Sequence, residues 1–162
     1  MVDIDSTVSW PAAPDAVLAL LTDEQFLRER GAALGAQVPE VTVAGSTTTA
    51  RLTAPTQGVP PVLARFVGAS VAVVERTTWT PDGAGGHRAV LDARAEVFGR
   101  AVVVTGERRL VPDAAGTRST VTADVTVDAP LVGAQAAGAV RQLVQVVLRR
   151  EGDLVRRRLT GA

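Results

Sequence analysis

The sequence has no cysteine, lysine or tyrosine, and few aromatic residues of any kind. Without cysteine, the chain has no disulfides, no thiolate catalysis and no cysteine-ligated metals. Aromatic residues make up only 3% of the chain, so we expect no platform for stacking nucleic-acid bases. The formal net charge is zero, so no overall field favours nucleic acid or an anionic membrane. We therefore expect no nucleic-acid partner.

Long apolar runs are also missing. No stretch approaches the ~20 residues of a membrane-spanning helix, so integral membrane association is not expected. The N-terminus, MVDIDSTVSW, is acidic and alternating, unlike the basic start and apolar core of a signal peptide. We therefore expect a cytoplasmic protein. No linker, internal repeat or low-complexity segment interrupts the chain, which predicts one domain over residues 1–162. The oligomeric state does not follow from the sequence.

The longest helical pattern covers residues 132–159, and the rest of the chain is organised around it. Its apolar residues recur at helical spacing and form one broad stripe: Val140, Leu143, Val144, Val147, Leu148, Leu154, Val155 and Leu159. Gly161 follows as a stop signal. A helix of this length needs a large apolar surface to cover.

Strand patterns supply that surface. Two short helices are predicted at residues 15–21 and 24–34, the second with Asp23 as a cap. Alternating or β-branched segments predict strands at residues 2–10, 38–45, 46–54, 70–80, 87–97, 100–111 and 118–128. Residues 61–67 are interpreted as a short helical turn or an irregular lid. Because short turns join consecutive strands, we expect an α+β fold in which an antiparallel meander is covered by the last helix.

This order of elements resembles the helix-grip superfamily (SRPBCC, START-like). The residues that carry the resemblance are the strand-end junction VDAPLVG at 127–133 and the long helix after it. The chain is most similar to an actinobacterial family of unknown function, DUF2505-like. Ala136 and Ala137 stand where that junction is often followed by acidic residues. The resemblance implies a curved sheet of about seven strands gripping the C-terminal helix around an apolar cavity that takes a small hydrophobic ligand.

Side-chain sizes point to the same cavity. Ala89, Ala93 and Ala95 share one face of a predicted strand, and such short side chains leave space beneath a helix. The few large apolar side chains could line this space or simply fill a core. The residues we expect at a ligand site are Phe66, Trp79, Leu91, Phe98, Val144, Leu148 and Glu151.

Glu151 is the unusual member of this set, because it projects from the middle of the apolar stripe. An unpaired buried carboxylate is costly, so a strand arginine such as Arg76 or Arg108 is a candidate partner. Three environments remain open: a group that faces a ligand, half of a structural ion pair, or an exposed overhang beyond the sheet. Desolvation would raise its pKa and an arginine would lower it.

No residue pattern indicates catalysis, a metal site or a cofactor. His87 is the only histidine, and it is interpreted as an exposed turn residue without a carboxylate partner. The first hypothesis is therefore a module that binds or carries a small hydrophobic molecule, lipid or polyketide-like, rather than an enzyme. The alternatives are a polyketide cyclase or dehydratase-like enzyme that uses the same cavity, and a protein-interaction module with a filled core.

Overall fold

The computed structural model describes residues 4–55, 70–97 and 99–161. The first element is β1 (Ile4–Trp10), followed by the short helices α1 (Pro14–Leu21) and α2 (Glu24–Ala33). Six strands come next: β2 (Gln37–Ala44), β3 (Thr47–Pro55), β4 (Ser70–Pro81), β5 (His87–Val97), β6 (Arg100–Asp113) and β7 (Gly116–Val127). The chain ends with α4 (Gly133–Thr160). The predicted helical turn or lid at residues 61–67 lies outside the described residues.

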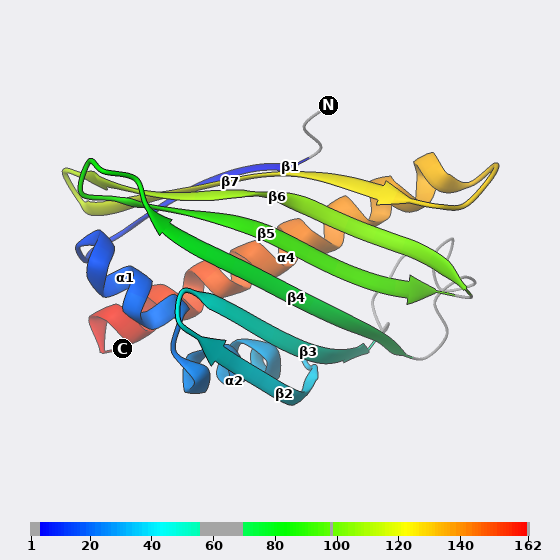
Figure 1. Cartoon of the computed structure of the whole chain (residues 1–162), viewed down its shortest axis with the longest axis horizontal. Helices are drawn as coiled ribbons and strands as arrows, with labels where there is room; N and C mark the ends of the chain where they lie inside the picture. The colour runs from blue at the N-terminus through cyan, green and yellow to red at the C-terminus, as the bar shows by residue number, and fades with distance from the viewer. Residues whose placement is uncertain (1–3, 56–69, 98, 162) are drawn as a thin grey trace.

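The strands form one antiparallel sheet in the order β1-β7-β6-β5-β4-β3-β2. Consecutive strands from β2 to β7 are neighbours, and β1 is added at the far edge beside β7. In Figure 1 the sheet curves over α4, which crosses beneath it, while α1 and α2 lie near the C-terminal end of α4. The predicted α+β helix-grip architecture is confirmed, including the number of strands.

Local chemistry explains the ends of the helices. The Asp23 side chain accepts a hydrogen bond from the Phe26 backbone N–H at 2.9 Å and so caps the start of α2 as predicted. At the other end of the chain, Gly161 closes α4 in the left-handed conformation with φ 71°, which glycine adopts without steric cost. Among the described residues, no helix combines the length and apolar character needed to span a membrane.

The most tightly packed part of the core lies at the C-terminal end of α4. Leu154 and Val155 pack there into one cluster with large side chains from β1, α1, α2 and the sheet: Trp10, Val17, Leu21, Phe26, Trp79 and Leu110. Helix α4 approaches β7, β1 and α2 most closely. The packing therefore anchors the helix at one end and along one edge of the sheet.

A candidate ligand cavity between the sheet and the long helix

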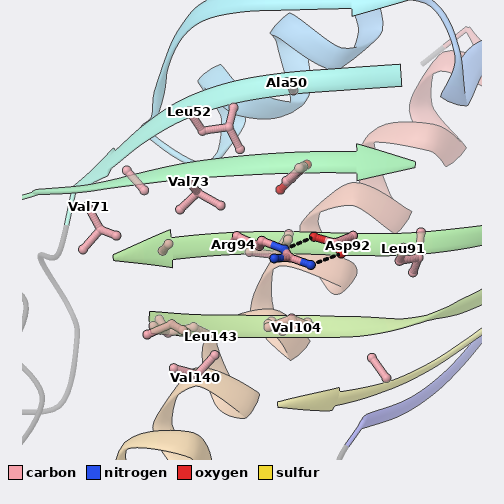
Figure 2. Close-up of a pocket in the computed structure, with 18 of the residues that line it drawn as sticks. Ala50, Leu52, Val71, Val73, Leu91, Asp92, Arg94, Val104, Val140 and Leu143 are labelled. Atoms are coloured by element: carbon pink, nitrogen blue, oxygen red, sulfur yellow. Dashed lines mark hydrogen bonds and ion pairs between the residues drawn. The ribbon is translucent and has the colours of Figure 1, made fainter. Parts of the chain in front are cut away.

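A cavity of about 680 Å³ lies between the sheet and α4. Its walls come from the inner faces of β3 to β7, from α2 and from one side of α4, and Figure 2 shows part of this lining. The volume falls in the ~300–1,000 Å³ range of sites for small molecules. The predicted cavity beneath the helix is thus present.

Small side chains on the sheet create this space. Strand register places Ala50, Glu75, Ala93 and Val104 in one row across four strands. The next row is Leu52, Val73, Ala95 and Val102. Side chains in one cross-strand row point to the same face, and alanine at the centre of each row leaves a gap that larger neighbours do not fill.

The helix side of the cavity is apolar but incompletely covered. Val140, Val144 and Leu148 pack beside the edge of the sheet formed by Ile4, Ala123 and Val125. These helix residues are half-buried, and Leu143, one turn along the same face, is 38% exposed. No residue of α4 before Glu151 is fully buried, so the first two-thirds of the helix cover the cavity and the edge of the sheet without being enclosed themselves.

The inner part of the cavity carries a cluster of four charged side chains, which we call the charged cluster: Arg30, Glu75, Arg108 and Glu151. Arg30 Nη1 donates to Glu151 Oε2 at 3.0 Å. Arg30 Nη2 donates to Glu75 Oε2, and Arg108 Nη2 donates to Glu151 Oε1. Four elements, α2, β4, β6 and α4, supply one residue each.

Burial and charge oppose each other at Glu151. The side chain is only 5% exposed, and burial by itself would raise its pKa. Arg108 and Arg30 outweigh that effect and hold the pKa below its ordinary value. Burial likewise disfavours charge on Arg30, yet Glu75 and Glu151 raise its pKa overall. Glu151 and Arg30 are therefore held in their ionised forms, within a chain of three ion pairs that runs from Glu75 through Arg30 and Glu151 to Arg108.

Of the three environments considered for Glu151, the exposed overhang is wrong. Of the two candidate partners that the sequence suggests, Arg108 forms an ion pair with Glu151. The other candidate, Arg76, is exposed on β4 and does not pair with Glu151. The second partner, Arg30, was not anticipated. The helical spacing of α2 places Arg30 on the same face as the buried Phe26 and Leu27. In the same way, Arg108 shares the inward alternation of Leu110 on β6 and is recognisable from that pattern.

Most of the residues expected at a ligand site do surround this cavity. Trp79, Leu91, Val144, Leu148 and Glu151 all line it. Phe66 and Phe98 lie outside the described residues. The structure thus brings five of the seven to one place.

The prediction for His87 is wrong in two respects. The residue begins β5, its side chain is only 14% exposed, and its Nε2 lies 2.7 Å from Oδ1 of Asp15 on α1. Strand β5 and helix α1 are far apart in sequence, so only tertiary packing reveals this partner. In the part of the chain that the structure describes, no group of three or more histidine, aspartate or glutamate side chains is placed to hold a metal ion.

Comparisons with known proteins agree with this architecture. Residues 5–159 match the model of a family described as "Protein of unknown function (DUF2505)". No curated protein matches the sequence significantly.

Solved structures share the fold at low sequence identity. The Zhui aromatase/cyclase from Streptomyces sp. R1128 is 16% identical with a TM-score of 0.63, covering 96% of this chain and 94% of that one. A START superfamily protein from Mycobacterium smegmatis is 15% identical with a TM-score of 0.58, covering 98% and 97%. A STAR-related lipid transfer protein from Xanthomonas axonopodis is 17% identical with a TM-score of 0.61, covering 94% and 84%. At such identities the likeness establishes a START-like fold.

Proposed function

The chain belongs to DUF2505, a family of proteins of unknown function, and we propose that it binds a small hydrophobic molecule. The molecule would occupy the apolar cavity between sheet and helix. The observation that carries this proposal is the volume of about 680 Å³ lined mainly by aliphatic side chains. Burying apolar surface there would stabilise a complex by roughly 25 cal/mol per Å² before the costs of association. The ligand would be lipid-like or polyketide-like.

The shared fold supports this proposal without identifying a ligand. Among the similar structures, one is named a lipid transfer protein and another an aromatase/cyclase. The first name concerns lipids, and the second concerns organic molecules that become cyclic and aromatic. The alternative of an interaction module with a filled core loses support, since the described residues leave the space beneath α4 open.

A dye-binding experiment tests the proposal. An environment-sensitive apolar dye should bind the wild-type protein, and Ala93→Phe should weaken binding at least severalfold because the ring occupies the cavity. The matched control is Ala72→Phe on the neighbouring strand β4, where the alanine is exposed. Native mass spectrometry should in addition detect a small molecule that copurifies. Failure of any dye or lipid to bind would contradict the proposal, as would equal weakening by both variants.

An enzymatic function is the second candidate, and the charged cluster beside the cavity is the observation that favours it. The lowered pKa of Glu151 argues against a general base, because a strongly stabilised carboxylate accepts protons poorly. Incubation with a linear polyketide analogue separates the two functions. Cyclisation or dehydration faster than in buffer supports an enzyme, whereas recovery of the unchanged bound compound supports binding alone.

A further inference from the structure

Three buried nitrogens at the inner part of the cavity have hydrogens but no acceptor among the described residues. They are Arg30 Nε, Trp79 Nε1 and Arg108 Nε, and all three side chains line the cavity. Trp79 is 5% exposed and Arg108 is 7% exposed. Buried donors in folded proteins are nearly always paired, so three orphans at one site need a physical reason.

The other tryptophan of the chain does have a hydrogen-bond acceptor for its indole N–H. Trp10 is fully buried, and its Nε1 donates to the Gly152 carbonyl oxygen at 3.1 Å. Trp79 belongs to the same apolar cluster as Trp10 but has no such partner. The difference is that Trp79 borders the cavity and Trp10 does not.

Strand register puts two of the orphan donors in one row. Trp79 on β4 pairs with Ala89 on β5, and Ala89 pairs with Arg108 on β6. Strands lie ~4.8 Å apart, so the backbones of Trp79 and Arg108 are separated by about 10 Å. Only the methyl group of Ala89 lies between their positions, and both side chains emerge on the face that lines the cavity.

The type of group that fits these donors follows from charge. All three orphans are donors, so the matching group must be an acceptor. The charged cluster holds two arginines and two glutamates, so its formal charge is already balanced. A ligand carboxylate would add a second negative charge close to Glu151 in a desolvated site, whereas a carbonyl oxygen would add none.

We propose, on the basis of the ligand-binding function above, that the ligand is a largely apolar molecule with an uncharged carbonyl oxygen, which accepts hydrogen bonds from Trp79 Nε1 and Arg108 Nε. Both nitrogens are covered by protein in the ligand-free structure, so a small rotation of the two side chains turns them toward the cavity when the ligand binds. The carbonyl end lies against the charged cluster. The apolar body extends along the alanine and valine rows toward the first turns of α4.

Three probes with the same two-ring skeleton test this orientation: the hydrocarbon tetralin, the ketone 1-tetralone and the carboxylate of tetralin-1-carboxylic acid. The ketone should bind about tenfold more tightly than the hydrocarbon, as expected for one or two hydrogen bonds to buried donors. The carboxylate should bind more weakly than the ketone. Calorimetry or NMR titration of the intact protein measures all three affinities.

The two tryptophans provide an independent readout. The chain has only two indole N–H signals in a ¹⁵N–¹H spectrum, and Trp79→Phe identifies which is which. Addition of 1-tetralone should move the Trp79 signal downfield and leave that of Trp10 nearly unchanged, and tetralin should move neither downfield. In Trp79→Phe, the preference for the ketone should fall severalfold while tetralin still binds. If this variant does not fold, nuclear Overhauser contacts to neighbouring side chains assign the two indole signals, and the shift in the wild-type protein decides the question.

Different failures separate this inference from the proposed function. Equal binding of ketone and hydrocarbon without an indole shift would overturn the carbonyl site and leave hydrophobic binding intact. Tightest binding by the carboxylate would overturn the choice of an uncharged acceptor. Binding of none of the three probes, together with failure of the dye experiment, would overturn the proposed function itself.

Discussion

The two ends of α4 rest on very different surfaces. Around Leu154 and Val155 the helix meets Trp10, Phe26 and Leu110, which are all fully buried. Around Val140 and Val144 the same helix faces a cavity of about 680 Å³. We call these the filled end and the hollow end.

Side-chain size on the sheet accounts for much of the difference. Strand β5 runs from one end to the other, and between Ala89 and Ala95 its inward residues are all alanines apart from Leu91. At the filled end, the aromatic residues Trp79 and Trp10 cover the space around Ala89. At the hollow end, the neighbours of Ala93 and Ala95 are valines and a glutamate. Large residues supplied by distant segments therefore decide where the protein is solid and where it is open.

The charged cluster marks the boundary between the two ends, and its loss should have the largest effect. In Glu151→Leu, Arg108 and Arg30 keep their positive charges in a buried site without their shared partner. We expect the free energy of unfolding to fall by about 3–5 kcal/mol. Urea denaturation monitored by circular dichroism measures this change. A loss below about 1 kcal/mol would mean that solvent replaces the ion pairs.

A matched pair of truncations on α4 tests the comparison directly. Leu154 is buried at the filled end and Leu143 is 38% exposed at the hollow end. Leu154→Ala should reduce stability by about 2–4 kcal/mol because it leaves a void in close packing. Leu143→Ala should cost less than about 1 kcal/mol, since its side chain has fewer neighbours to lose. Similar losses in thermal denaturation would show that the two ends are equally well packed.

Enlarging two alanines on β5 gives a smaller contrast, with opposite preferences at the two ends. Ala89 is fully buried at the filled end, so Ala89→Val should cost about 1–3 kcal/mol by overpacking. Ala95 lines the cavity, so Ala95→Val should be neutral or stabilise the fold by up to about 1 kcal/mol. The melting temperatures of the two variants measure the contrast. A destabilising Ala95→Val would indicate that the hollow end is smaller than the structure shows.

Acidification should produce the most gradual change. The pKa of Glu151 in the folded protein lies below its ordinary value of 4.5, so the stabilisation is complete above that value. Protons bind the unfolded chain first as the pH falls, and the contribution is lost progressively down to the lower folded pKa. Unfolding free energies measured from pH 6 to pH 3 should decline less steeply for Glu151→Gln than for the wild type. Parallel curves would show that Glu151 does not contribute to the loss of stability at low pH.

Local patterns in the sequence were sufficient for the framework of this protein. The geometry of the chain itself sets the helical spacing from Val140 to Leu159 and the strand alternation along β5 and β7. The elements and their order along the chain were therefore predictable. The same periodicity exposed Glu151 as a carboxylate on an apolar stripe. Arg108 was named only as one of two strand arginines that could pair with it. The inward alternation of Arg108 with Leu110 on β6 is the signal that favours it.

Tertiary structure alone decided which groups meet. Arg30 reaches Glu151 across 121 positions of sequence, and His87 reaches Asp15 across 72. Neither pairing has a local signature, because each depends on how separate elements pack. The same holds for the two tryptophans, since one indole finds a helix carbonyl and the other is left facing a cavity. Periodicity reports which face a side chain occupies, whereas its neighbours on that face come from the whole fold.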